Sequence, residues 1–309
     1  AAAGGKLTWH FVAPDVHDFV WAADPDYTHT TLQREDGTVL HFFYQQNERT
    51  EDAWARLPAI MDRVFDFVNE RYGPYPYQQY SFVQGGDGGM EYPMATLITG
   101  ERSLLSLVGV SVHELMHSWY QMLLGTNESL YAWMDEGFTS YASSEVMNYL
   151  RREGILPGEA TDNPHRGSVS GYVNFSQSGL EEPLSVHSDH YATNSAYSVA
   201  AYVKGAVFLT QLSYILGEEV FRQAMLDYYY TWRFQHPNAN DFIRVMEKRS
   251  GLELDWFKEY FVYTTKTIDY GIREVAPAGA GQTRLTLEKV GPMPMPLDVL
   301  VTYADGSSE

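Results

Sequence analysis

Two histidines and a glutamate near the middle of the chain have the spacing of a catalytic metal site. His113 and His117 are four residues apart, and Glu114 directly follows the first, which gives the pattern His-Glu-x-x-His. Side chains four residues apart share one face of a helix, so both imidazoles can reach one zinc ion. Glu114 then lies beside the metal, where a base for a metal-bound water has to be. The pattern predicts metal-assisted hydrolysis.

A third ligand is needed, because a catalytic zinc ion takes three protein ligands and keeps a fourth position open. Glu136 is the candidate, with 18 residues between it and His117. That interval lets the first helix end, a loop turn at 125–130 and a second helix begin at Asp135. The alternative is a surface helix with two unrelated histidines, which the apolar surroundings of the motif disfavour.

Four segments make the sequence similar to the gluzincin zinc aminopeptidases of the aminopeptidase N and leukotriene hydrolase type. The zinc pattern with its 18-residue gap is the first of them. The others are 88–91, which resembles Gly-x-Met-Glu-Asn, 133–138, which resembles Trp-x-Asn-Glu-Gly, and 201–205, which resembles Tyr-x-Lys-Gly. They stand in the order and spacing of the family. The resemblance covers about residues 45–268.

This resemblance implies a role for each matching metal-binding or catalytic residue. One zinc ion is held by His113, His117 and Glu136, and Glu114 is the general base for the zinc-activated water. Tyr202 donates a hydrogen bond from its hydroxyl to the oxyanion that develops in the reaction. Donors at such a position typically have a large effect on the reaction rate.

The substrate-binding residues also follow from the resemblance. Glu91 binds the free α-ammonium of a peptide, and the backbone of Gly88 and Gly89 lines the peptide. The expected partners are therefore peptides with a free amino terminus. Lys204, in the last of the four segments, is expected at the surface.

The sequence departs from the family pattern at several positions. Tyr92 stands where the family has Asn, and Asp135 replaces the usual Asn beside the third ligand. Ser143 stands where an acid is common, and Glu145 is a possible substitute. The groups that orient the two histidines stay open.

Three alternatives share some of these features. A zinc endopeptidase uses the same chemistry but has no need for Glu91. A non-catalytic peptide-binding relative typically loses the metal ligands or the base, which are all present here. Epoxide hydrolysis at the same zinc ion is the third, and no residue argues for or against it.

Composition narrows the possible partners. The chain has 309 residues, no cysteine and a formal net charge of −19. An acidic surface repels phosphate backbones, so nucleic acid is not an expected partner, whereas cationic ligands are favoured. Without cysteine, disulfides, thiolate catalysis and cysteine zinc sites are excluded.

Two features of the sequence bear on the cellular compartment. No uninterrupted apolar run reaches the roughly 18–20 residues needed to span a bilayer, so no transmembrane segment is expected. Residues 1–6 do not form a signal peptide. We expect a periplasmic, cell-envelope or secreted protein from the habits of the family, with the cytoplasm as the alternative.

The periodicity of apolar residues divides the chain into strand-like ends and a helical middle. Strand patterns occur at 7–12, 39–44, 79–84, 95–99, 283–287 and 299–303. Helical patterns occur from about 51 to 72, at 103–124, 135–151, 195–216, 218–232, 239–250 and 254–264, whereas 152–190 resembles a loop.

Together with the resemblance, this order implies an α+β fold. We expect a thermolysin-like, mostly helical catalytic domain with a small β-sheet at 46–268. The flanks are the tail of an N-terminal β domain at 1–45 and the start of a β-sandwich-like segment at 269–309. In relatives, the complete N-terminal domain donates a further Gln or Glu to the amino-terminus site. The chain is therefore expected to be a fragment whose partners are the remaining domains, with weak exopeptidase selectivity alone.

Overall fold

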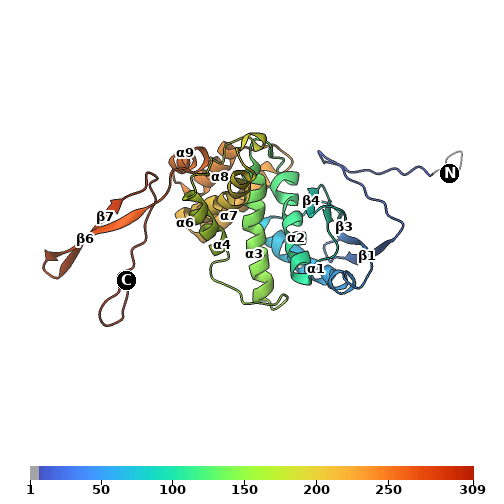
Figure 1. Cartoon of the computed structure of the whole chain (residues 1–309), viewed down its shortest axis with the longest axis horizontal. Helices are drawn as coiled ribbons and strands as arrows, with labels where there is room; N and C mark the ends of the chain where they lie inside the picture. Colours follow the sequence, from blue (N-terminus) through green and yellow to red (C-terminus); the bar gives the residue numbers. More distant parts are fainter. Residues whose placement is uncertain (1–6) are drawn as a thin grey trace.

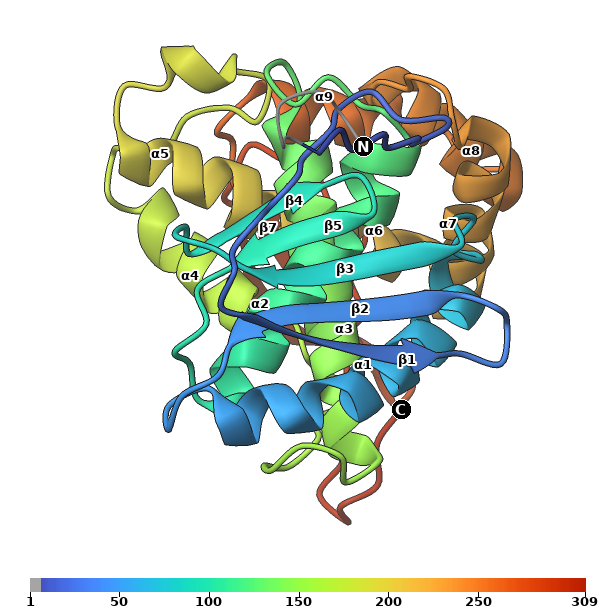
Figure 2. The same cartoon turned by 90° about the vertical axis from the view of Figure 1, so that its right-hand side faces the viewer.

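A five-stranded sheet with helices on one of its faces forms the body of the computed structural model, which describes residues 7–309 (Figure 2). Residues 1–6, whose sequence does not match a signal peptide, lie outside the described part. The strands are β1 (Tyr27–Gln33), β2 (Val39–Gln45), β3 (Gln79–Gln84), β4 (Gly89–Tyr92), β5 (Ala95–Ile98), β6 (Tyr270–Gly279) and β7 (Gln282–Lys289). The α+β class expected from the sequence is confirmed.

The sheet has the strand order β1-β2-β3-β5-β4. Strands β2, β3 and β5 are parallel, and β1 and β4 pair antiparallel at the two edges. The boundary predicted at 45/46 therefore falls between strands of one sheet, because β2 is hydrogen bonded to β3. The division into three domains stays a prediction.

Helices pack on the sheet through apolar faces that the sequence pattern predicts. The long α1 (Glu51–Tyr72) buries Trp54, Leu57, Met61 and Val64, spaced by three or four residues. The other helices are α2 (Leu104–Met116), α3 (Phe138–Arg152), α4 (Arg166–Ser176), α5 (Asn194–Ser198), α6 (Gly205–Leu216), α7 (Glu218–Trp232), α8 (Ala239–Ser250) and α9 (Asp255–Tyr263). Shorter or wider helical turns are η1 (Ser118–Leu123), η2 (Trp133–Gly137), η3 (Ser188–His190) and η4 (Val199–Lys204).

Two helical predictions need correction. The helix expected over 103–124 ends as a regular helix at Met116, and a kink in η1 follows, with non-helical backbone angles at Tyr120 and Gln121. The loop expected over 152–190 contains α4, which has no fully buried residue and is rich in glycine and serine. Neither feature leaves a clear apolar period, and the sequence pattern therefore misses both.

Two predicted strands do not form. Residues 7–12 are extended and largely exposed, and they have no strand partner in the described part of the chain. Residues 299–303 contribute only an isolated bridge, between Thr302 and Ser308. Both segments have the composition of strands but no neighbouring strand with which to pair.

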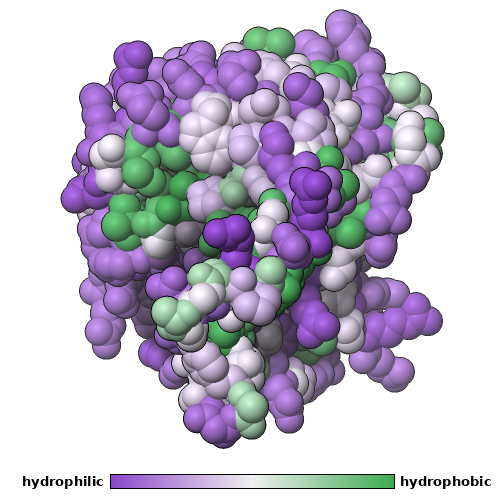
Figure 3. All heavy atoms as spheres, turned by 90° about the vertical axis from the view of Figure 1, so that its left-hand side faces the viewer, coloured by the Kyte–Doolittle hydropathy of each residue, from purple (hydrophilic) through white to green (hydrophobic). Residues whose placement is uncertain are grey.

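The hairpin β6–β7 extends away from the helical body (Figure 1). Its exposed Ile272 and Val275 pair with Leu287 and Leu285 across the hairpin, so these apolar side chains lie on one face. Figure 3 shows this side of the molecule, where apolar patches interrupt a largely polar surface.

One stretch of the described residues, Asn194–Leu216, is long and apolar enough to cross a membrane by length and composition. Half of its most apolar window is buried in the protein, and a core helix passes the same test.

Candidate metal centre and active-site cavity

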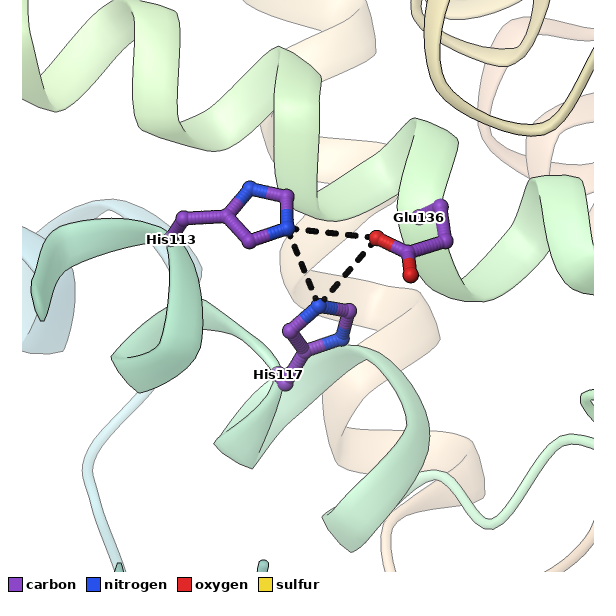
Figure 4. Close-up of side chains that lie close together, drawn as sticks. All are labelled: His113, His117 and Glu136. Carbon is purple, nitrogen blue, oxygen red and sulfur yellow. Dashed lines mark hydrogen bonds and ion pairs between the residues drawn. The ribbon is translucent and has the colours of Figure 1, made fainter. Parts of the chain in front are cut away.

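His113, His117 and Glu136 converge on one point from two helical segments (Figure 4). The Nε2 atom of His113 lies 3.2 Å from Oε2 of Glu136 and 3.2 Å from Nε2 of His117. The Nε2 atom of His117 lies 3.3 Å from the same glutamate oxygen. The structure thus brings together the three side chains that the sequence nominated as metal ligands.

These distances fit a zinc ion. Ligand atoms about 2.0–2.1 Å from one zinc ion in tetrahedral geometry lie about 3.3 Å from one another. The donor set of two imidazole nitrogens and one carboxylate oxygen is also one that catalytic zinc ions take. Two imidazole nitrogens that face each other at this distance can bind one cation between them.

Asp135 fixes the orientation of His117. Its Oδ1 atom lies 2.6 Å from Nδ1 of His117, and both side chains are almost completely buried. An Nδ1–H that donates to this carboxylate leaves the Nε2 lone pair directed at Glu136 and His113. Although burial opposes the charged imidazole, the carboxylates of Asp135 and Glu136 raise the pKa of His117. The sequence had left the partner of this histidine open.

A close backbone contact sets Glu136 beside Tyr202. Gly137, directly after Glu136, and Gly205, three residues after Tyr202, touch so closely that a Cβ atom on Gly205 would lie 2.8 Å from Cα of Gly137. Only glycine permits this approach at both positions. As a result, the Tyr202 hydroxyl donates a hydrogen bond of 2.6 Å to Oε1 of Glu136. Burial, followed by the charge of Glu136, raises the pKa of Tyr202, which keeps the phenol a donor.

Glu114 lies in the same cavity, against strand β4. A Cβ atom on Gly89 would lie 2.2 Å from Oε1 of Glu114, so glycine is what lets the strand pass this carboxylate. Burial is the largest effect on the pKa of Glu114. The charge of His117 lowers this pKa, whereas the carboxylates of Glu91 and Glu136 raise it further. Together these effects bring the pKa of Glu114 to about 8. A value near neutrality suits a group that takes up and releases a proton.

Glu91 is buried in this cavity without a hydrogen-bond partner in the described part of the chain. It is 8% exposed, and the nearest cationic group is Nδ1 of His117, 3.8 Å from Oε1. The cavity has a volume of about 390 Å³. Its lining residues are Gly89, Met90, Glu91, His113, Glu114, His117, Glu128, Ser129, Asp135, Glu136, Ser188, Tyr197 and Tyr202.

Several residues named in the sequence lie elsewhere. Gly88 is next to the cavity rather than in its lining, and its carbonyl accepts a hydrogen bond of 2.6 Å from Arg102. Glu145 contacts His165 at 2.9 Å and Arg71 at 3.6 Å and does not orient a zinc-binding histidine. Conversely, Glu128, Ser188 and Tyr197 line the cavity although they lie in none of the four segments that match the family.

Lys204 is buried, whereas the sequence pattern had placed it at the surface. Its Nζ atom donates to Oε1 of Glu181 at 2.7 Å and to the carbonyl of Thr264 at 3.1 Å. Aromatic rings of α4 and α9 lie 5.7 Å from the ammonium. The η4 segment that carries Tyr202 is therefore tied to three other parts of the chain.

We expect Lys204→Met to lower the free energy of unfolding by about 3–5 kcal/mol, because it leaves the carboxylate of Glu181 buried without a counter-charge. Denaturant unfolding measures the change. The paired replacement Lys204→Met with Glu181→Leu should recover most of the loss. If Lys204→Met alone were as stable as the parent, the ion pair between Lys204 and Glu181 would not stabilise the fold.

Comparison with known proteins places the chain in a family. The model of the peptidase family M1 domain matches residues 59–261, more than half of the chain. The chain belongs to peptidase family M1. The resemblance seen in the four sequence segments is thereby confirmed at the level of the family.

Curated M1 relatives are distant and longer. Aminopeptidase B from Mus musculus is 28% identical over 225 residues, which are 68% of this chain and 32% of the relative. Leucine aminopeptidase 2-1 from Meyerozyma guilliermondii is 27% identical over 218 residues, which are 64% of this chain and 32% of that protein. The chain thus spans about a third of the length of these relatives.

A solved M1 structure shares the fold. The M1 zinc metallopeptidase from Deinococcus radiodurans superimposes with a TM-score of 0.59 at 18% sequence identity. The match covers 78% of this chain and 52% of that chain. At this identity the likeness bears on the fold alone.

Proposed function

We propose that this M1 chain is the catalytic part of a zinc aminopeptidase that hydrolyses N-terminal residues from peptides. Zinc would be held by His113, His117 and Glu136, whose mutual distances suit a single ion. Two M1 relatives are named as aminopeptidases, and the M1 protein of similar fold is named as a zinc metallopeptidase, which supports this function. The proposal extends to a thermolysin-like arrangement of residues 46–268 and to the remaining domains of a longer chain as partners.

The residues of the cavity can divide the work of peptide hydrolysis. A bound zinc ion supplies a Lewis acid that polarises the scissile carbonyl and activates water. Glu114 takes up the proton of the attacking water and returns it to the leaving amine. The Tyr202 hydroxyl, next to the metal ligands, donates a hydrogen bond to the oxygen on which negative charge develops.

Glu91 is the residue that favours an aminopeptidase over an endopeptidase, because only an aminopeptidase has to bind a free α-ammonium. A buried carboxylate without a hydrogen-bond donor destabilises the folded protein unless a cation pairs with it. An α-ammonium bound there would set the register, so that only the first peptide bond reaches Glu114. The buried, unpartnered carboxylate of Glu91 beside the three metal ligands is the observation on which the proposal rests.

The test compares one peptide with a free and an N-acetylated amino end on the zinc-loaded protein. We expect stepwise release of the first residue from the free peptide, and slower cleavage of the acetylated one by about tenfold or more. Glu91→Gln should narrow this ratio, and Glu70→Gln, an exposed site on α1, should leave it unchanged. Equal cleavage of both peptides at internal bonds favours an endopeptidase. No cleavage of either favours a non-catalytic binding protein.

A further inference from the structure

Glu128 brings a second carboxylate to the place where Glu91 is expected to hold an ammonium. It lies on the loop between η1 and η2 and lines the same cavity. Carboxylate oxygens of Glu91, Glu128 and Asp135 all lie within 4.8 Å of one another. We propose that Glu91 and Glu128 together bind the substrate's α-ammonium. This inference rests on the proposed aminopeptidase function and adds a binding residue to it.

The spacing of the oxygens suits one ammonium group. Charged N–H···O hydrogen bonds are about 2.7–2.9 Å long, so two hydrogens of one tetrahedral ammonium reach oxygens about 4.4–4.7 Å apart. The oxygens of this group of acids, which lie within 4.8 Å of one another, match that span. A single ammonium can therefore donate to Glu91 and Glu128 at once, with two of its three hydrogens.

The cavity itself offers these acids little positive charge. Its lining contains no lysine or arginine among the described residues, and the two histidines belong to the metal cluster. One oxygen of Asp135 is engaged by Nδ1 of His117. Outside the cavity, His17 is hydrogen bonded to Gln121 at 3.2 Å. Glu91 is buried, and Nδ1 of His117, 3.8 Å away, lies closer to Asp135, so a ligand ammonium would supply the charge that Glu91 lacks. Glu128 is exposed, and its carboxylate can turn from solvent to the same ammonium.

The loop that carries Glu128 is held in place. The Ser188 hydroxyl donates to the backbone carbonyls of Glu128 at 3.1 Å and Ser129 at 3.2 Å, and the Ser188 amide donates to Ser129 at 2.8 Å. Its other end is closed by backbone bonds from Leu130 and Tyr131 to the carbonyl of Asn127. Because the backbone of this loop is already ordered, only the rotamer freedom of the Glu128 side chain is lost when a ligand binds.

The second ammonium-binding side chain would come from the catalytic unit itself. The sequence resemblance implies a further acid or amide from an N-terminal domain. Glu128 belongs to the same unit as the metal ligands. Under this proposal, and in place of the weak selectivity expected from the sequence, this unit alone discriminates a free amino end from a blocked one.

The experiment measures binding and turnover separately. Calorimetry follows leucinamide and N-acetyl-leucinamide binding to the zinc-loaded Glu114→Gln protein, in which turnover is slow. With Glu128→Gln added, leucinamide affinity should fall at least about tenfold, while N-acetyl-leucinamide affinity stays the same. In the parent enzyme, the same replacement should raise KM for free-amine substrates, change kcat little and leave zinc content at one ion. Glu128→Asp, which keeps the charge, should restore part of the affinity.

Asp189→Asn is the matched control for a general loss of negative charge, because Asp189 is exposed beside Ser188 and outside the cavity lining. It should leave leucinamide binding unchanged. Unaltered leucinamide binding in Glu128→Gln would overturn the inference, and so would a second metal ion per chain that this replacement removes. If the parent protein with zinc cleaves no free-amine substrate, the proposed function fails. If the parent cleaves these substrates and Glu128→Gln has the same KM and leucinamide affinity, only the inference about Glu128 fails.

Discussion

Glu114→Gln is expected to lower kcat by about 10²–10⁴-fold while the protein keeps its zinc ion. General acid–base catalysis contributes this order of magnitude, and an amide cannot take up the proton. The replacement preserves size, which matters because the side chain is buried against Gly89. Turnover of an aminoacyl chromogenic substrate and metal analysis of the same sample measure the two quantities.

The stability of this variant separates loss of chemistry from loss of fold. Burial raises the folded-state pKa of Glu114 above its ordinary value, to about 8. An acid with a raised pKa takes up a proton on folding, so its charge opposes folding increasingly between its ordinary pKa and about pH 8, and by a constant amount above that. A neutral glutamine removes this cost, and the zinc-free variant should unfold at a temperature no lower than the zinc-free parent. Activity within a factor of about three of the parent would exclude Glu114 as the base.

His113→Ala is expected to abolish both zinc binding and activity. It removes one of three ligands, and its partly exposed side chain can be shortened without opening the core. After dialysis, zinc should fall below about a tenth of an ion per chain, with turnover at background. The same loss should follow treatment of the parent with a chelator and be reversed by added zinc.

Thermal unfolding gives a readout of zinc binding that does not depend on activity. A ligand that binds only the folded state, at 100 times its dissociation constant, stabilises it by about 2.7 kcal/mol. Added zinc should therefore raise the unfolding temperature of the parent but not of His113→Ala. His190→Ala, at an exposed histidine outside the cavity, is the control and should respond to zinc as the parent does. Equal zinc responses in all three proteins would place the ion elsewhere.

The sequence could predict the metal centre because its constraints are short in range. His113 and His117 share a helical face through the period of the backbone alone. The position of Glu136 follows from a gap that lets one helix end and another begin. The helices with strong apolar periods, such as α7 and α8, were likewise predicted at the bounds that the structure has.

Only the tertiary structure decided what surrounds these residues. Lys204 meets Glu181 and Glu128 approaches Glu91 through contacts between segments far apart in the chain, which no local period encodes. The kink after α2 and the glycine-rich α4 also depend on packing, because neither has an apolar repeat. Local spacing determined which side chains can hold a metal ion, whereas the packing of distant segments decided which carboxylates line the cavity beside them.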